Sequence, residues 1–140
     1  MAVFTAALVA RHSDKLVSVT ASGSADGAEG VQWTDKNQTN QHWNFVATTG
    51  GYYHVIAVHS GKLLSVVASG TADGAAVVQW TDKGQPNQEW KLVQKDDVYF
   101  SLEARHSGKL LSVLASGTAD GDKLVQWTDS GQPNQQFRLG

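Results

Sequence analysis

Three tryptophans occur in the same short phrase, Gln-Trp-Thr-Asp, each time ahead of a polar loop that carries glycine or asparagine. They are Trp33, Trp80 and Trp127. Each lies where a predicted strand reaches the surface, and exposed aromatic rings on a rigid scaffold usually mark a binding surface. The alternative role is a rim tryptophan that only seals the end of the domain. We expect the three rings to take part in binding.

Each of these tryptophans is followed, seven residues later, by an Asn-Gln pair. The pairs are Asn40-Gln41, Asn87-Gln88 and Asn134-Gln135. An amide side chain offers both a donor and an acceptor, so it can pair with a hydroxyl group in either sense. This chemistry suits a neutral ligand. The alternative is that the amides only tie down the loop backbone, which is a common use of asparagine beside turns.

The recurrence of these residues reflects an internal repeat of 47 residues. His12, His59 and His106 are separated by this period, and so are the three tryptophans. Residues 59–92 and 106–139 are identical at 26 of 34 positions. The three copies, about 1–47, 48–94 and 95–140, fill the 140-residue chain and predict a single domain over residues 1–140.

Within the middle copy, the pattern predicts short strands over residues 52–59, 62–68, 75–80 and 89–93, separated by turns. No helical periodicity extends beyond one turn, so the fold class is all-β. Four strands per repeat would fit a propeller blade, but propellers usually have four to eight blades. Three repeats therefore favour a β-trefoil built from three four-stranded units.

The phrases SGKLLSV, ASGTADG, VVQW and NQEW, repeated three times, resemble the ricin-B-type or QxW lectin family. The QxW motifs are Gln41-His42-Trp43, Gln88-Glu89-Trp90 and Gln135-Gln136-Phe137. The resemblance covers the whole chain and implies a β-trefoil that binds sugars without a cofactor. It also implies that Trp43, Trp90 and Phe137 are inward-facing core residues.

The family assigns a different role to the tryptophans of the Gln-Trp-Thr-Asp phrase, which match the aromatic platform under a sugar ring. One face of a pyranose presents C–H bonds that a flat aromatic ring can cover, while the hydroxyls remain free for hydrogen bonds. The resemblance further implies that Asn40, Asn87 and Asn134 contact the sugar, whereas the following glutamines partly hold the loop.

The sequence departs from the family at one position in every repeat. Where well-known sites carry Leu-Asp-Val, with the aspartate accepting hydrogen bonds from sugar hydroxyls, this chain has Ser18, Ser65 and Ser112. A charge-assisted hydrogen bond is worth about 1.5–3 kcal/mol, against about 0.5–1.5 kcal/mol for a neutral one. The serines therefore predict weaker or re-aimed recognition, such as that of a less hydroxylated ring.

Another carboxylate could replace the missing one. Asp35, Asp82 and Asp129 follow the platform tryptophans and are the preferred replacements, although an Asx-turn would give them a structural role instead. The alternative set is Asp26, Asp73 and Asp120. These lie in Ala-Asp-Gly phrases, for which a hairpin turn is the stronger interpretation.

The three repeated histidines raise the possibility of a zinc site on a threefold axis. Each begins a turn between two strands, and such turns are spread around a trefoil, so we expect no metal and a role in stabilising the turn or in supporting residues that contact the ligand. The sequence also lacks cysteine and the HExxH, GxSxG and phosphate-loop motifs. A glycosidase carboxylate pair needs two different environments, which identical repeats do not provide. We expect no enzymatic activity.

Composition narrows the class of partner. The net charge is −2 and the isoelectric point about 6.2, without runs of like charge, so we expect neither nucleic-acid binding nor attraction to anionic membranes. No apolar run approaches the roughly 20 residues of a membrane span, and the N-terminus lacks a secretory signal. The compartment stays open, with the lectin resemblance leaning towards an extracellular location.

The sequence thus predicts a monomeric, multivalent lectin with up to three sites, one per repeat. The ligands expected are neutral sugars on cell-surface glycoconjugates or polysaccharides, either galactose-type or deoxyhexoses such as L-rhamnose, and we expect agglutinating activity. The alternative is a non-lectin trefoil that serves as an inhibitor or protein-interaction module.

Overall fold

The computed structural model describes residues 3–140, which form short strands joined by loops and 3₁₀ turns. In the first repeat the strands are β1 (Val3–Ala6), β2 (Leu8–Ala10), β3 (Leu16–Val19), β4 (Gly30–Trp33) and β5 (Trp43–Ala47). The second repeat holds β6 (Tyr52–Ala57), β7 (Leu63–Val66), β8 (Val77–Trp80) and β9 (Trp90–Gln94). The third holds β10 (Phe100–Ala104), β11 (Leu110–Val113), β12 (Leu124–Trp127) and β13 (Phe137–Leu139).

Two 3₁₀ turns punctuate each repeat. They are η1 (Thr20–Ser22), η2 (Thr39–Gln41), η3 (Val67–Ser69), η4 (Pro86–Gln88), η5 (Leu114–Ser116) and η6 (Pro133–Gln135). Among these turns, none is long and apolar enough to cross a membrane.

The all-β prediction is confirmed, with strands that are shorter than the sequence pattern indicates. The strand expected over 62–68 ends at Val66, because Ala68 and Ser69 have φ angles of 51° and 54° and turn the chain into η3. Left-handed backbone is rare for alanine, so nothing in the apolar pattern announces this turn. The first strand of the first repeat is also divided, at Ala7, into β1 and β2.

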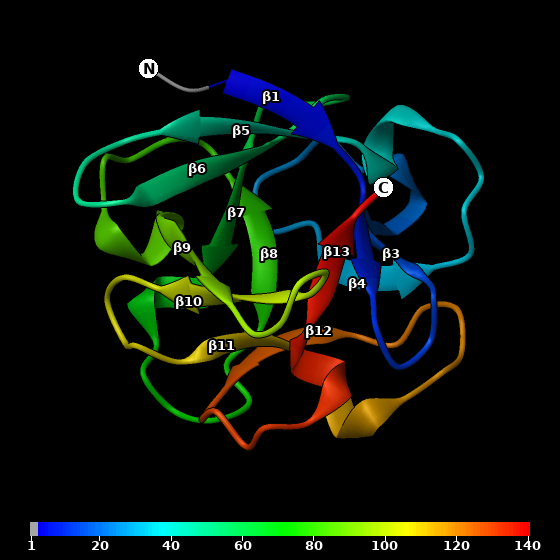
Figure 1. Cartoon of the computed structure of the whole chain (residues 1–140). Helices are drawn as coiled ribbons and strands as arrows, with labels where there is room; N and C mark the ends of the chain where they lie inside the picture. Colours follow the sequence, from blue (N-terminus) through cyan, green and yellow to red (C-terminus); the bar gives the residue numbers. More distant parts are fainter. Residues whose placement is uncertain (1–2) are drawn as a thin grey trace.

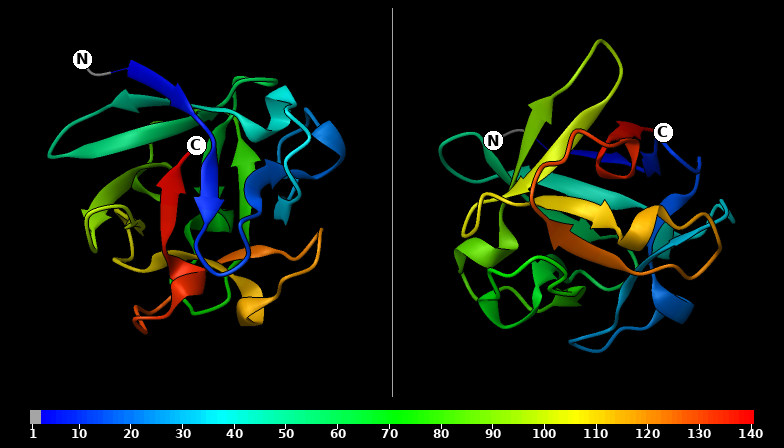
Figure 2. Two further views of the ribbon diagram at one scale, coloured as in Figure 1. Left: turned by 45° about the vertical axis from the view of Figure 1, so that its right-hand side comes forward. Right: turned by 90° about the horizontal axis from the view of Figure 1, so that it is seen from below.

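The last strand of each repeat pairs with a strand at the start of the next repeat, so the strands close into a ring. β5 pairs with β6, β9 pairs with β10, and β13 returns to pair with β2, all antiparallel. Figure 1 follows the chain around this ring from blue to red, and Figure 2 shows the β9–β10 hairpin from two further sides. Each repeat is therefore tied to both of its neighbours by backbone hydrogen bonds.

The middle strands of each repeat form a separate hairpin: β3–β4, β7–β8 and β11–β12. The three hairpins touch one another through isolated bridges between Glu29 and Val78, Val31 and Lys123, and Ala76 and Val125. A ring of paired strands closed by three hairpins is the β-trefoil expected from the repeat number.

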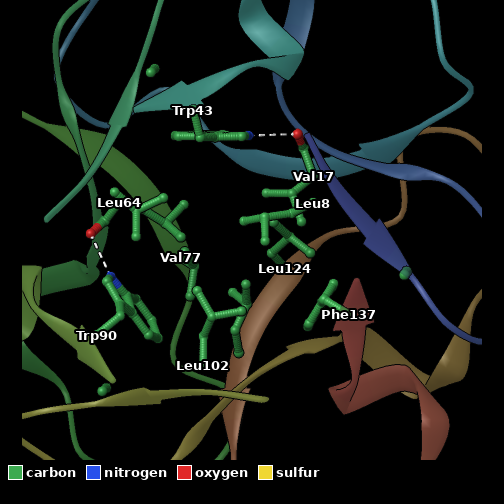
Figure 3. Close-up of a cluster of buried hydrophobic side chains, with 14 of the residues drawn as sticks. Leu8, Val17, Trp43, Leu64, Val77, Trp90, Leu102, Leu124 and Phe137 are labelled. Carbon is green, nitrogen blue, oxygen red and sulfur yellow. Dashed lines mark hydrogen bonds between the residues drawn. The ribbon is translucent and has the colours of Figure 1, made fainter. Parts of the chain in front are cut away.

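The core places one large aromatic side chain from each repeat at the same position, namely Trp43, Trp90 and Phe137. All three are fully buried, as expected (Figure 3). Trp43 Nε1 donates to Val17 O and Trp90 Nε1 to Leu64 O, both at 2.9 Å. Phe137 has no donor and contributes packing alone.

Candidate ligand-binding sites

Each repeat carries one open pocket in the same place, between the end of its middle hairpin and the loop that leads to the second 3₁₀ turn. The cavity volumes are about 370, 330 and 410 Å³ in the first, second and third repeats. In the second repeat the lining includes Ser65, Val78, Trp80, Lys83, Asn87 and Gln88. These volumes lie at the lower end of the range for small-molecule sites, which is about 300–1,000 Å³.

The tryptophans predicted to form platforms lie at the ends of β4, β8 and β12 and line the pockets. Their exposed fractions are 38%, 38% and 41% for Trp33, Trp80 and Trp127. Part of each ring also packs against the preceding repeat in the ring: a Cβ added to Gly27 would lie 3.5 Å from Trp80 Cζ3. Each ring thus offers an accessible surface while its far edge helps to seal the repeats together.

The predicted asparagines line the same pockets and are each buried to more than nine-tenths. Asn87 Nδ2 donates to Val66 O at 2.8 Å, while Oδ1 finds no hydrogen-bond donor among residues 3–140. Asn40 and Asn134 repeat both features. An unsatisfied buried acceptor costs about 1–3 kcal/mol, so a hydroxyl supplied by a ligand or by water would stabilise this arrangement.

The glutamines and serines line the pocket floor, but their polar atoms are used within the protein. Gln88 Nε2 donates to Thr81 O at 2.9 Å and to Ser65 Oγ at 3.2 Å, and its Oε1 accepts from Lys83 N at 2.8 Å. Ser65 Oγ in turn donates to Leu63 O. The same bonds recur around Gln41 with Ser18 and around Gln135 with Ser112. In every repeat the pair therefore fixes the loop that carries the asparagine.

The preferred replacement carboxylates, Asp35, Asp82 and Asp129, do not line these pockets. Asp82 Oδ1 accepts from Gly84 N at 2.8 Å, which is the Asx-turn considered as their alternative role. Asp35 Oδ1 and Asp129 Oδ1 likewise accept from the backbone N–H of the residue two positions later. The pKa of Asp129 is lowered mainly by the hydrogen bond from the backbone N–H of Gly131, and to a smaller extent by the hydrogen bond from the Lys95 side chain. The role of a substitute sugar acceptor stays a prediction, and the structure shows that one oxygen of each carboxylate is already used in a local turn.

The second set of aspartates also has a structural task, and it differs from a simple hairpin turn. Asp26 Oδ1 accepts from both the backbone N–H and the hydroxyl of Thr81 in the next repeat, each at 2.8 Å. Asp73 makes the same pair of bonds to Thr128, and Asp120 to Thr34. The threonine hydroxyl is the largest cause lowering the pKa of each carboxyl.

These aspartates belong to three crossing loops, residues 23–29, 70–76 and 117–123, which pack on the next repeat of the ring. Gln79 anchors the first of them: its Nε2 donates to Gly23 O and Ala25 O, both at 2.9 Å. Gln32 and Gln126 anchor the other two. Sequence reasoning missed these residues, although a glutamine inside an otherwise apolar strand of every repeat was the available signal.

The repeated histidines complete the anchoring. His59 Nε2 lies 2.6 Å from Gly23 O, and His12 and His106 have the equivalent contacts with Gly117 O and Gly70 O. Each histidine therefore holds a different crossing loop. Within residues 3–140, no group of three or more His, Asp or Glu side chains is arranged to hold a metal ion.

The closed ring and the threefold pockets define a β-trefoil with three equivalent units. The family described as ricin-type beta-trefoil lectin domain-like matches residues 5–80, 39–127 and 86–140. The chain belongs to this family, and a lectin-like domain supports a carbohydrate-binding role. No curated protein matches the chain.

Solved structures agree with the family. A designed three-fold symmetric protein, ThreeFoil, is 44% identical with a TM-score of 0.95, over 96% of each chain. An exo-β-1,3-galactanase from Clostridium thermocellum, 1,3Gal43A, is 36% identical with a TM-score of 0.94, over 96% of this chain. The match covers only 29% of that enzyme's chain. The Rhizoctonia solani agglutinin shares the fold, with 19% identity and a TM-score of 0.89 over 99% of this chain and 95% of its own.

Proposed function

We propose that this protein is a lectin that binds neutral sugars through three shallow pockets, one in each repeat. The observation that carries the proposal is the threefold recurrence of a partly exposed tryptophan beside a pocket of small-molecule size. The ring would cover the C–H face of a pyranose. The pocket wall would then meet the hydroxyl groups at the edge of the sugar.

The asparagine beside each ring supplies the polar half of recognition. Asn87 Oδ1 lacks a donor within the described protein, and a sugar hydroxyl is a donor of suitable size once the side chain adjusts to admit it. The serine floor adds no charged acceptor. Hydrogen bonds from the asparagine to the sugar are neutral, at about 0.5–1.5 kcal/mol each, and a ring that lacks one hydroxyl loses little. Galactose-type sugars and deoxyhexoses such as L-rhamnose or fucose are the proposed ligands.

The same pockets favour binding over catalysis. No Asp or Glu lines any of the three pockets within residues 3–140. Hydrolysis of a glycoside normally requires two carboxyl groups at the scissile bond, held in different environments. We therefore propose that the domain recognises glycans on cell surfaces or polysaccharides as a monomer, without chemistry or a cofactor, and that its three sites allow agglutination.

A glycan array followed by calorimetry tests the proposal. Purified protein is expected to bind neutral galactosides or deoxyhexosides, and the triple variant Trp33→Ala, Trp80→Ala, Trp127→Ala is expected to lose this binding. Val98→Ala is the matched control, because Val98 is an exposed apolar residue in the turn between β9 and β10, outside the pockets. Circular dichroism establishes that each variant is folded. A folded protein that binds no glycan would instead indicate the inhibitor or protein-interaction module.

A further inference from the structure

The three pockets differ in charge at one lining position. The first pocket carries Lys36, the second carries Lys83 and the third carries Ser130 in the same place. No acidic side chain lines any of them in the described part of the chain. Two pockets thus have a positive group at the wall, and the third has none.

The backbone presents these three side chains from the same point. The main-chain N–H of Lys36, Lys83 and Ser130 each donates to the Oε1 of the pocket glutamine, at 2.8, 2.8 and 2.9 Å. Ser130 also turns its hydroxyl back onto Gln135 Oε1, at 3.1 Å. The serine side chain is therefore short, and its hydroxyl is already hydrogen-bonded. The lysines carry a long side chain from the same backbone position at the edge of the pocket.

Neither of the two lysine ammonium groups forms an ion pair within residues 3–140. The ion pairs among residues 3–140 involve other lysines and two arginines, and neither Lys36 Nζ nor Lys83 Nζ takes part. The carboxylates nearby have other partners. Asp26, which lies near Lys83, bonds to Thr81 and has Lys62 Nζ at 3.8 Å.

In the first repeat, too, the carboxylates near the pocket lysine have other partners. Asp120 lies near Lys36, accepts from Thr34, and has Lys15 Nζ at 3.9 Å. The neighbour of Lys36 in the chain, Asp35, accepts from Asn37 N. Lys83 and Lys36 therefore act on these aspartates only through their charge, without an ion pair, and their ammonium groups can form an ion pair with an anionic group on a ligand.

We propose that the pockets of the first and second repeats recognise sugars that carry an anionic substituent, a carboxylate or a sulfate, through Lys36 and Lys83. The third pocket has Ser130 in this place and does not favour an anionic sugar over a neutral one. This inference rests on the proposed lectin function and divides its three sites into two kinds. Such a protein would select polysaccharides in which acidic and neutral sugars occur together.

The size of the effect follows from the exposure of the lysines. Exposed ion pairs are worth little, while charge-assisted hydrogen bonds at a partly enclosed site are worth more, so we expect a preference of about three- to tenfold for the anionic sugar. Added salt should reduce this preference, because the Debye length is about 10 Å at 0.1 M ionic strength and about 3 Å at 1 M. Binding through the tryptophan face should be far less sensitive to salt.

Single-site proteins provide the test. Replacing two of Trp33, Trp80 and Trp127 by alanine leaves one pocket at a time, and titration with D-galactose, D-galacturonate and D-galactose 6-sulfate separates a neutral, a carboxylate and a sulfate ligand on one sugar scaffold. The first and second pockets are expected to favour one or both anions, and the third is not. Lys36→Ser and Lys83→Ser should bring the anion-to-galactose affinity ratio close to one, and Ser130→Lys should raise it in the third pocket.

Lys123→Ser is the matched charge control, because Lys123 is exposed and lies outside the pocket linings. An equal affinity for all three sugars in the lysine-bearing pockets, with galactose still bound, overturns the inference and leaves the lectin proposal intact. A preference that survives the lysine-to-serine changes overturns it as well. If folded protein binds no sugar here or on a wider array, the lectin proposal fails and this inference fails with it.

Discussion

At the scale of single residues, the two tryptophans in the QxW-containing phrase of the second repeat lie ten residues apart yet occupy different environments. Trp90 is enclosed by the core and donates to Leu64 O, while Trp80 keeps an accessible surface at the pocket. We expect Trp90→Ala to cost about 3–5 kcal/mol of unfolding free energy, because it leaves a large cavity. Trp80→Ala should cost less, about 1–2 kcal/mol, because the ring is partly exposed, and it should remove binding at its repeat. Thermal denaturation and calorimetry measure the two effects.

Trp90→Phe is the informative control for this pair. Phe137 shows that a phenyl ring fits the equivalent position of the third repeat, so the variant should fold. It loses the hydrogen bond to Leu64 O and part of the packing, and the expected cost is about 1–3 kcal/mol. Equal losses of stability for Trp80→Ala and Trp90→Ala, with binding untouched by both, would contradict the separate roles.

Ser65 provides a second test at this scale. Ser65→Asp restores the carboxylate found in related sites, but it loses the hydroxyl donor to Leu63 O and places a charge at a buried position beside Gln88 Nε2. We expect a loss of about 1–3 kcal/mol in stability together with a changed sugar preference at the second repeat. The measurement is a glycan array on protein whose other two sites carry Trp33→Ala and Trp127→Ala. An unchanged profile in folded protein would remove the serines from the site.

At the scale of elements, the crossing loops determine how one repeat supports the site of the next. Asp73 accepts from the N–H and hydroxyl of Thr128, which follows Trp127, the proposed platform residue of the third repeat. The Thr128 hydroxyl is the main cause that lowers the pKa of Asp73. A lowered folded-state pKa contributes stability above the unfolded value of about 3.9, and this contribution is lost as the pH falls through the folded-state pKa.

We therefore expect the melting temperature to fall on acidification below about pH 4, and Asp73→Asn to weaken that dependence. Asparagine retains an acceptor oxygen for Thr128 but cannot titrate, so the variant should melt lower than the unchanged protein near neutral pH and lose less on acidification. Asp97→Asn, at an exposed position in the turn after β9, controls for the loss of one negative charge. Identical pH profiles for Asp73→Asn and the unchanged protein would contradict the role of this carboxylate.

These loops also show where prediction from the sequence stops. Strand order and the buried aromatics follow from local pattern and from the period, because strands and cores leave a regular apolar signature. Asp26 and Thr81 are 55 residues apart, and Gln79 meets Gly23 across a similar separation. Nothing in the Ala-Asp-Gly phrase distinguishes a local turn from a contact of that length. The sequence therefore indicates which residues recur, whereas only the fold assigns their partners.

The roles of some pocket residues could be predicted from the sequence, while others depend on contacts that only the fold shows. Trp80 and Asn87 could be proposed from chemistry and resemblance, since exposed rings and unpaired amides suit a ligand. The assignment of Asp82 to the site stays a prediction: its Oδ1 accepts from Gly84 N in a short-range turn, and the residue does not line the pocket of its repeat. The turn at Ala68 was also beyond the sequence, because alanine gives no sign of left-handed backbone.

At the scale of the whole molecule, threefold repetition turns weak sites into a multivalent surface. For a neutral sugar, each open pocket is expected to use one aromatic face with a few neutral hydrogen bonds, so a single site should have a Kd of about 10⁻⁴ to 10⁻³ M after ordering costs. On a glycan-coated surface the second and third contacts are effectively intramolecular. Avidity should then exceed single-site affinity by about 10²–10⁴ where the spacing of the glycans permits.

We expect the monomer to agglutinate suitably glycosylated cells, because pockets related by a threefold axis face different directions and can bridge two surfaces. Free monosaccharide at millimolar concentration should inhibit agglutination, and replacing two of Trp33, Trp80 and Trp127 by alanine should abolish it. Sedimentation checks the oligomeric state, and calorimetry with a neutral sugar should report close to three sites per chain. A stoichiometry of one, with agglutination surviving the double replacement, would overturn the trivalent monomer and assign the valency to an oligomer of chains with one specialised repeat each, because a monomer with a single remaining pocket cannot bridge two cells.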